Sequence, residues 1–241
     1  TMAGLEVASV TPASGAFAQV VIGEILTAEP HPEADRLRVC TVGAGAAGVL
    51  QIVCGAPNAR PGIRVPLALV GAELPGDFKI RPAKLRGVES FGMLCSAKEL
   101  GIDEDASGLM ELPSDAPVGE DLRVYLDLED ALIEVDLTPN RADCLSVEGI
   151  AREVSLLNGL EWSPIDPPMV SITTSTVKVV ELPDPSDCPR YLGQLIEGVD
   201  RNAPTPLWMR ERLRRSGIRS LDILVDVTNY VLLEMGQPLH A

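Results

Sequence analysis

Two β-rich runs joined by a Pro-His-Pro turn make up residues 20–43, VVIGEILTAEPHPEADRLRVCTVG. Runs of the same kind follow at residues 49–54, at 64–71 and within 78–95, and turns rich in glycine and proline separate them. Short strands at near-regular spacing with turn residues between them are typical of a β-sandwich or a small β-barrel. The first hundred or so residues are therefore predicted to be mainly β-structure.

The length and composition indicate several packed domains. The 241 residues are 46% hydrophobic, which excludes intrinsic disorder and provides enough apolar surface for a buried core. Single domains usually have about 100–150 residues, so this length suggests two or three of them. Five strands within about a hundred residues fit an OB-type β-barrel, which we expect to be one of these domains.

The charge is concentrated in one part of the chain. The formal net charge of −15 by itself argues against nucleic-acid binding, because phosphate contacts need clustered Lys and Arg. Residues 101–170, however, hold 17 acidic and 3 basic side chains, whereas residues 20–100 hold 8 and 9. The β-rich region is balanced, and its charge does not exclude contact with RNA.

The second half of the chain predicts helices. Pro113 and Pro117 prevent a long helix in the acidic stretch 102–130. Beyond it, Asp143 is expected to cap a helix that ends at Gly159. Four further elements are expected: β-like runs near 170–180 and at 191–199, a helix from Thr205-Pro206 to Gly217, and a helix capped by Asp226 that ends at Gly236.

The cysteines and the apolar runs indicate a cytoplasmic protein. The five cysteines are odd in number and no two have the spacing of a zinc or redox site, so we expect free thiols and no metal site. The first residues lack the basic and apolar regions of a signal peptide. Residues 39–59 carry no charge, but Gln51, Pro57 and Asn58 break the run, so no membrane span is expected.

Motifs of the β-rich region resemble the tRNA-binding OB domain of several synthetases and tRNA-binding cofactors. They are residues 21–25 (VIGEI), 31–40 (HPEADRLRVC), 53–58 (VCGAPN) and 86–96 (RGVESFGMLCS). Each motif is moderately specific, and their occurrence together in this order makes the resemblance strong.

Later stretches are similar to the β subunits of bacterial phenylalanyl-tRNA synthetases. They are residues 137–146 (LTPNRADCLS), 188–191 (CPRY), 225–230 (VDVTNY) and 236–241 (GQPLHA). The resemblance covers essentially the whole chain and implies an N-terminal fragment with an α+β, multi-domain fold. It implies these domains: a small α+β domain of residues 1–16 and 126–165, an OB domain of residues 17–125 inserted in it, and the incomplete beginning of an α/β editing domain at 170–241.

The resemblance also implies an activity, cofactors and partners. The whole enzyme would be a phenylalanine–tRNA ligase, an (αβ)₂ tetramer whose α subunit performs synthesis with ATP and Mg²⁺. Its editing domain would hydrolyse tyrosine wrongly attached to tRNA(Phe), which is needed because a site for phenylalanine rejects an added hydroxyl only about 10²-fold. The fragment is expected to contact tRNA(Phe) but no DNA, to bind no cofactor itself, and to be inactive alone.

The densest cationic stretch of the β-rich region holds four candidate tRNA contacts: Lys79, Arg81, Lys84 and Arg86. On an extended strand, alternate side chains share a face, so Lys79 would lie on one face with Arg81, and Lys84 would lie on one face with Arg86. The side chains of Phe78, Ile80 and Leu85 would then turn inward. Such a stripe would follow phosphates, and the alternative is a solvated strand edge kept soluble by its charges. Aromatic residues are scarce here, so we expect contact led by charge and shape, without base reading.

The resemblance implies four candidate editing residues: Thr228, Asn229, Gln237 and His240. His240 would orient a water molecule or hydrogen-bond the ester of a misacylated tRNA 3′ end. Helix capping or packing is the alternative role for Thr228 and Asn229. Five arginines near the preceding helix could meet tRNA or an acidic partner, or form an ordinary exposed helix face: Arg210, Arg212, Arg214, Arg215 and Arg219.

Three other features favour structural roles. His31 lies between two prolines and has no second ligand at metal-site spacing, so we expect it to belong to a turn. The glycine-rich run 43–48 lacks the Gly-Lys-Ser/Thr of a phosphate loop and predicts a hairpin turn. The acidic run 103–105 does not continue as a calcium loop and predicts a solvated turn.

Two other functions compete with this interpretation. A free-standing tRNA-binding or chaperone-like OB module would explain residues 20–100 but not 139–241. An interaction scaffold would use the acidic segment 101–170 to dock a basic partner.

Overall fold

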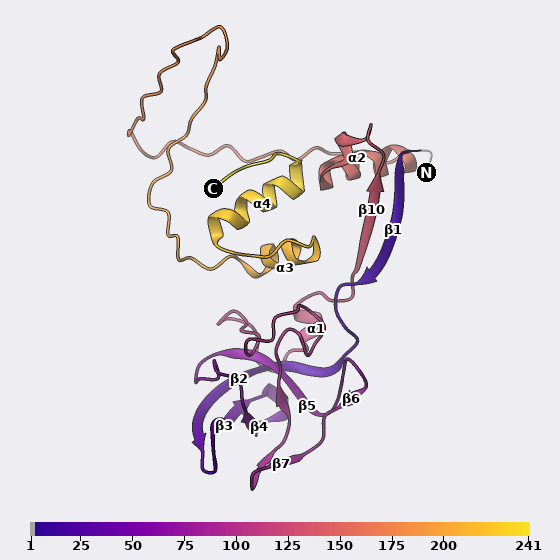
Figure 1. Cartoon of the computed structure of the whole chain (residues 1–241), viewed down its shortest axis with the longest axis vertical. Helices are drawn as coiled ribbons and strands as arrows, with labels where there is room; N and C mark the ends of the chain where they lie inside the picture. Colours follow the sequence, from indigo (N-terminus) through magenta and orange to yellow (C-terminus); the bar gives the residue numbers. More distant parts are fainter. Residues whose placement is uncertain (1–2) are drawn as a thin grey trace. The chain divides into compact units, whose positions relative to one another are not determined.

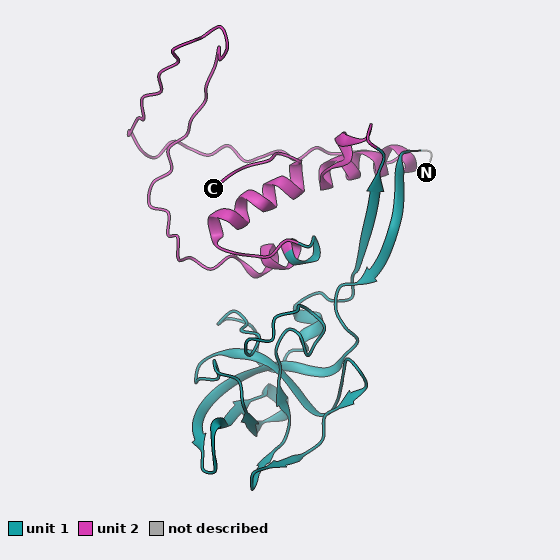
Figure 2. Ribbon diagram, viewed as in Figure 1, with its two compact units in different colours: residues 1–138, 214–217 teal, residues 139–213, 218–241 magenta. Residues whose placement is uncertain are grey.

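The computed structural model describes residues 3–241 (Figure 1). These residues form two compact units (Figure 2): one comprises Thr1–Thr138 and Arg214–Gly217, the other Pro139–Leu213 and Ile218–Ala241. The first two residues of the predicted small α+β domain lie outside the described part. Every strand among the described residues belongs to the first unit, so the fold is mixed, with a strand-rich unit and a helical one.

The main sheet of the first unit is antiparallel and confirms the predicted β-rich runs. Its strands are β2 (Ala18–His31), β3 (Ala34–Gly43), β4 (Val49–Cys54), β5 (Arg64–Leu74), β6 (Phe78–Lys79) and β9 (Met93–Leu94). They follow the order β4-β3-β2-β5-β6, and β9 also pairs with β5. The hydrogen-bonded order of these described strands is an open path, without the return that would close a barrel.

Alternate residues of these strands build the core of the sheet. Ile25, Cys40, Val42, Ile52 and Leu67 are all fully buried. Successive side chains of a strand point to opposite faces, so Cys40 and Val42 share the inward face of β3. Burial of a large apolar side chain stabilises the folded state by roughly 1.5–3 kcal/mol.

Two small antiparallel sheets complete the strands of the first unit. β1 (Leu5–Pro12) pairs with β10 (Ala131–Leu137), which lies beyond the main sheet in the sequence. β7 (Ala83–Leu85) pairs with β8 (Val88–Ser90) in a tight hairpin. The proline-containing stretch 102–130 holds only the short α1 (Leu122–Tyr125), capped by the Asp121 carboxylate, so the expected absence of a long helix there is confirmed.

The second unit contains the helices that the sequence predicted, with different N-caps. Its elements are the 3₁₀ turn η2 (Ala142–Cys144), α2 (Val147–Asn158), the greater part of α3 (Leu207–Arg215) and α4 (Ile223–Met235). Ser146, not Asp143, caps α2, and Asp222, not Asp226, caps α4. Both predictions were wrong because capping depends on which side chain meets the free N–H groups of the first turn. The predicted glycine ends are confirmed, since Gly159 and Gly236 have left-handed conformations.

Residues 160–206 contain neither helix nor strand, so the β-like runs expected near 170–180 and at 191–199 were wrong. Their apolar side chains are solvent-exposed, with 89% of Ile172 and 75% of Leu192 accessible. A strand is stable only when a neighbour pairs with its backbone and its apolar face is covered. Neither condition is met for this segment. No helix of the described residues is long and apolar enough to cross a membrane.

Candidate nucleic-acid interface

The β7–β8 hairpin carries an arginine at its tip. The two turn residues, Arg86 and Gly87, have φ values of 44° and 85°, which is the pattern of a type I′ turn. This turn matches the twist of the strands, but its first position favours Asn, Asp or Gly, because a larger side chain there costs about 1–2 kcal/mol. The hairpin therefore presents a guanidinium where backbone preference selects against one.

Two side chains from other strands, and one side chain of the hairpin itself, attach the hairpin to the main sheet. The ring of His31, at the end of β2, lies 3.1 Å from the Leu85 carbonyl oxygen through Nε2. The Gln51 amide of β4 donates to the Glu89 carbonyl at 2.8 Å. The Ser90 hydroxyl accepts from the Val53 N–H at 3.0 Å. The hairpin is thus attached to the main sheet along both of its strands.

The four predicted tRNA contacts do not form one stripe. Lys79 lies on β6 and makes a 2.8 Å ion pair with Glu73, and this hydrogen bond lowers the pKa of the Glu73 carboxyl. Arg81 is exposed between β6 and β7, and Lys84 lies on β7 opposite Glu89 in the ladder. Arg86 occupies the turn itself, so it does not share a strand face with Lys84. The predicted pairing of faces was wrong because β6 ends at Lys79 and Arg86 lies in the left-handed turn that follows β7.

The apolar residues of this stretch also differ from the prediction. Ile80 is buried as expected, but 55% of Phe78 and 41% of Leu85 are exposed. Phe91, which directly follows β8, is exposed as well. Exposed aromatic side chains beside cations are the combination on which unpaired bases stack. The stretch from β6 to Phe91 therefore carries exposed cations and two partly exposed phenylalanines.

The four predicted editing residues lie at the end of the second unit. Thr228 and Asn229 are on α4, and the Thr228 hydroxyl donates to the Val225 carbonyl at 2.8 Å, within its own helix. Gln237 and His240 lie on the exposed segment after α4.

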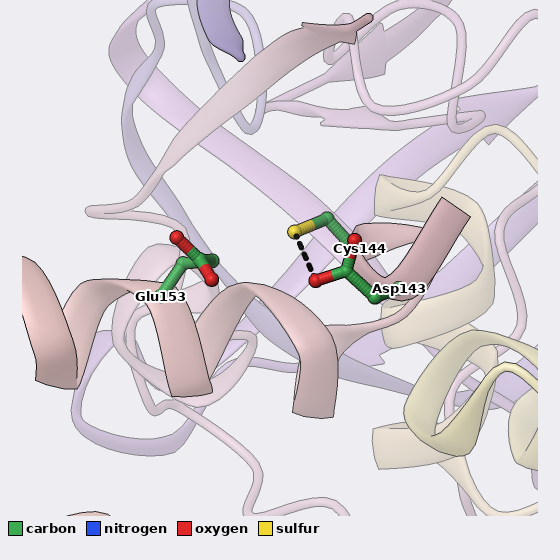
Figure 3. Close-up of side chains that lie close together, drawn as sticks. All are labelled: Asp143, Cys144 and Glu153. Atoms are coloured by element: carbon green, nitrogen blue, oxygen red, sulfur yellow. Dashed lines mark hydrogen bonds between the residues drawn. The ribbon is translucent and has the colours of Figure 1, made fainter. Parts of the chain in front are cut away.

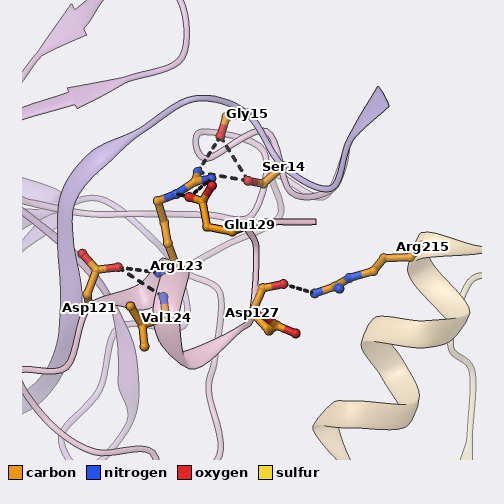
Figure 4. A network of polar contacts seen from close by, with 8 residues as sticks. All are labelled: Ser14, Gly15, Asp121, Arg123, Val124, Asp127, Glu129 and Arg215. Atoms are coloured by element: carbon orange, nitrogen blue, oxygen red, sulfur yellow. Dashed lines mark hydrogen bonds and ion pairs between the residues drawn. The ribbon is translucent and has the colours of Figure 1, made fainter. Parts of the chain in front are cut away.

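Two of the five predicted arginines, Arg214 and Arg215, are engaged inside the first unit, and Figure 4 shows Arg215 beside Asp127. Arg215 donates to the Leu126 and Asp127 carbonyls at 2.7 and 3.0 Å and pairs with Asp130 at 2.8 Å. Arg214 donates to the carbonyls of Ile102 and Ala13. In the same network, Arg123 donates to Gly15 and Ser14 and pairs with Glu129. These guanidiniums hold loop carbonyls and are not an open face for RNA.

The remaining three arginines belong to the second unit. Arg212 donates to the Tyr230 hydroxyl at 3.0 Å, and its guanidinium lies over the Trp208 ring at 5.6 Å. Trp208 in turn meets Tyr230 edge to face, with ring centroids 5.3 Å apart. Arg210 and Arg219 are exposed. The aromatic and cation–π contacts of Arg212 join α3 to α4.

A group of potential metal ligands gathers beside α2 although the sequence showed no metal spacing. The ligand atoms of Asp143, Cys144 and Glu153 lie within 4.8 Å of one another (Figure 3). The Arg141 guanidinium, however, donates to Asp143 at 3.1 Å and to Cys144 at 3.0 Å, and pairs with Glu153 at 2.7 Å. Burial also raises the pKa of the Cys144 thiol, which keeps it protonated and a poor ligand. The ion pairs of this cluster hold η2 against α2.

A cavity of about 430 Å³ opens next to β4 and β9 in the first unit. Its lining includes Cys54, Met93, Ser96 and Glu99. The Glu99 carboxylate accepts from both the N–H and the hydroxyl of Ser96, at 2.7 and 2.8 Å, so these polar groups satisfy each other. Burial raises the pKa of the Cys54 thiol. The lining therefore offers no reactive group, although much of it comes from the motifs at residues 53–58 and 86–96.

Two family descriptions match the chain. Residues 20–121 match a putative tRNA binding domain, and residues 187–241 match the B3/4 domain. The first match contains the whole β7–β8 hairpin and its anchors. The second contains α3, α4 and the four predicted editing residues.

Several curated proteins are similar to the chain over all of its residues. The phenylalanine–tRNA ligase β subunit of Methylococcus capsulatus is 63% identical, that of Pseudomonas putida 62%, and that of Pseudoalteromonas translucida 57%. The chain spans 30% of the length of each of these relatives. Among solved structures, a MetRS related protein from Pyrococcus horikoshii is 26% identical over 42% of this chain and 85% of its own, with a TM-score of 0.32.

Proposed function

We propose, because this chain belongs to the phenylalanine–tRNA ligase β-subunit family, that it contributes tRNA docking to the ligase through the β7–β8 hairpin. The observation that carries this proposal is the exposed cationic hairpin, anchored on a domain of tRNA-binding type. Lys84 and Arg86 would contact phosphates, and Arg81 would extend the contact toward β6. Lys79 is the weakest of the four candidates because Glu73 already neutralises it.

Charge reversal of the hairpin is expected to weaken tRNA binding. In the 241-residue chain, Lys84→Glu with Arg86→Glu should lower the affinity for a tRNA(Phe) transcript by about tenfold or more at low salt. The salt dependence of log K should also become shallower by about 0.7–0.9 for each phosphate contact that is lost. Both quantities can be measured by fluorescence anisotropy at several salt concentrations.

A matched control separates this contact from a general effect of net charge. Lys178→Glu with Arg201→Glu makes the same change in net charge at two exposed positions of the segment between α2 and α3. This control should leave both affinity and salt dependence close to those of the unmodified chain. If the two double variants behave alike, the hairpin is not the docking site.

We also propose that residues 170–241 form part of a domain that hydrolyses mischarged Tyr-tRNA(Phe). The B3/4 match over residues 187–241 is the observation that favours this second role. His240 would orient the water or bind the ester, with Thr228, Asn229 and Gln237 supplying further hydrogen bonds. The exposed segment 160–206 would pair with other parts of that domain.

Loss of the imidazole is expected to abolish editing selectively. In the ligase assembled with its α subunit, His240→Ala should slow hydrolysis of Tyr-tRNA(Phe) by about 10²-fold and leave aminoacylation with phenylalanine unchanged. Leu239→Ala, at the neighbouring exposed position, is the control and should hydrolyse normally. Normal hydrolysis by the His240 variant would remove this residue from the site.

Several wider features belong to the same proposal. Residues 17–125 would close as an OB barrel inserted into a small α+β domain of residues 1–16 and 126–165. The pairing of β1 with β10 across the intervening sequence supports such an insertion. The α subunit would be the partner in an (αβ)₂ ligase, and aminoacylation, with ATP and Mg²⁺, would take place on that subunit.

Among the described residues, the glycine-rich run and the carboxylates beside α2 are the two candidate sites for ATP or Mg²⁺, and neither fits its ligand. The glycine-rich run folds as η1 (Gly45–Ala47), where a Cβ at Gly45 would lie 2.7 Å from the Gly119 Cα, so Gly45 serves backbone packing. The Asp143 and Glu153 carboxylates beside α2 are both ion-paired with Arg141. We therefore assign no step of the synthetic reaction to these two sites.

A further inference from the structure

We propose that His31 is a positioning residue for RNA binding, which fixes the tip of the β7–β8 hairpin without touching the RNA itself. This inference rests on the proposed docking role of the hairpin. His31 comes from the His-Pro motif between β2 and β3, for which the sequence indicated only a turn.

Both ring nitrogens of His31 are used, and this defines the tautomer. The side chain is buried, with 5% of its surface accessible. Its Nδ1 accepts a hydrogen bond from the Glu33 N–H at 3.0 Å. Nε2 must therefore carry the proton of the neutral ring, and it donates to the Leu85 carbonyl at 3.1 Å. The imidazole links the β2–β3 turn to the hairpin.

The hydrogen bond from His31 is made to the hairpin residue that lies between its two cations. Leu85 is the last residue of β7 and lies between Lys84 and Arg86. It pairs with Val88 across the turn, and a carbonyl oxygen with two lone pairs can accept from the histidine as well. Gln51 and Ser90 attach β8 to β4, whereas His31 attaches the β7 side at the turn. Fixing the Leu85 peptide also fixes the start of the Arg86 backbone.

The hairpin needs such an anchor for energetic reasons. A two-stranded ribbon is at best marginally stable in water, and the left-handed conformation of Arg86 adds to its cost. A mobile tip would have to be ordered when RNA binds, and that ordering would reduce affinity. Because His31 already holds the tip in place in the free protein, the tip does not have to be ordered when RNA binds. The neutral ring adds no charge to the hairpin.

The experiment uses two substitutions that each keep one of the two hydrogen bonds. The amide nitrogen of Gln in His31→Gln reaches the position of Nε2 and can donate to Leu85, whereas the amide oxygen of Asn in His31→Asn reaches that of Nδ1 and accepts only from Glu33. We expect His31→Asn to weaken tRNA(Phe) binding by the 241-residue chain about five- to tenfold, and His31→Gln to stay within about twofold of the unmodified chain. Neither variant should change the salt dependence of log K, since His31 makes no phosphate contact.

Thermal unfolding and the Lys84→Glu with Arg86→Glu variant complete the test. If affinity falls equally in the Gln and Asn variants, in proportion to a common loss of stability, His31 is only a structural residue and the inference fails. If both keep full affinity while the charge-reversal variant loses it, the inference fails and the docking role stands. If charge reversal has no effect, the docking role fails first and this inference with it. Should His31→Asn not fold, amide hydrogen exchange at Val88, which pairs with Leu85 across the turn, decides in His31→Gln, because retained protection is expected and its loss contradicts the anchor.

Discussion

Gly149→Ala is expected to destabilise the helical unit by about 3–5 kcal/mol. A Cβ at this position would lie 2.0 Å from the Asp143 carbonyl oxygen and 2.9 Å from the Cys144 Cα. These are backbone atoms of η2, so they cannot move aside as a flexible side chain would. Displacing them would also break the N-cap of α2, in which the Ser146 hydroxyl accepts from the Gly149 N–H at 3.0 Å.

Urea unfolding followed by tryptophan fluorescence measures this loss directly. Both tryptophans, Trp162 and Trp208, belong to the second unit, so the signal reports that unit. Gly159→Ala is the control, because Gly159 ends the same helix at φ 62° with open space around it. It should cost only about 1 kcal/mol, the price of a left-handed alanine. Equal losses in the two variants would show that close packing of η2 on α2 is not the reason for Gly149.

Asp226→Ala is expected to cost about 3–5 kcal/mol in the same unit. The Asp226 carboxylate is completely buried and accepts from the Thr205 and Ser220 hydroxyls and, at 2.9 Å, from the Leu221 N–H. Removing it leaves three donors without their acceptor in the interior. The same fluorescence experiment applies, and Asp222→Ala, which removes only the exposed cap of α4, should lose about 1 kcal/mol. A loss for Asp226→Ala as small as that of the cap variant would contradict the role of the buried carboxylate.

The stability that Asp226 provides should depend on pH. Burial by itself raises the pKa of this carboxyl, but the hydrogen bonds from Ser220, Thr205 and Leu221 outweigh it, and the pKa is lowered. A carboxyl whose pKa is lower in the folded state than the unfolded value of about 4 stabilises the fold fully above that value. The contribution is lost as the pH falls through the folded-state pKa. The difference in free energy of unfolding between the unmodified chain and Asp226→Asn should therefore become smaller from neutral to acidic pH. A difference that stays constant over this range would contradict the prediction.

Parts of the fold were predictable because their signals are local. In β3, inward residues such as Cys40 and Val42 alternate with less buried ones, and Gly159 and Gly236 end helices where only glycine is unstrained. The caps were not predictable in the same way. Asp143 and Asp226 are both plausible helix caps in the sequence. In the structure, however, Asp143 pairs with Arg141, and Asp226 accepts hydrogen bonds from buried donors such as the Ser220 hydroxyl. Each carboxylate has a partner brought to it by folding.

The candidate interface was likewise predictable only in part from the sequence. The sequence by itself determined that the β-rich region carries four cations close together in the chain, and its motifs indicated the resemblance to a family. Only the tertiary structure decided that Lys79 is paired with Glu73, that Arg86 forms the turn, and that His31 holds the turn in place. The reason is physical: periodicity and composition are properties of neighbouring residues, whereas His31 and Leu85 are 54 positions apart and meet only when the sheet has formed.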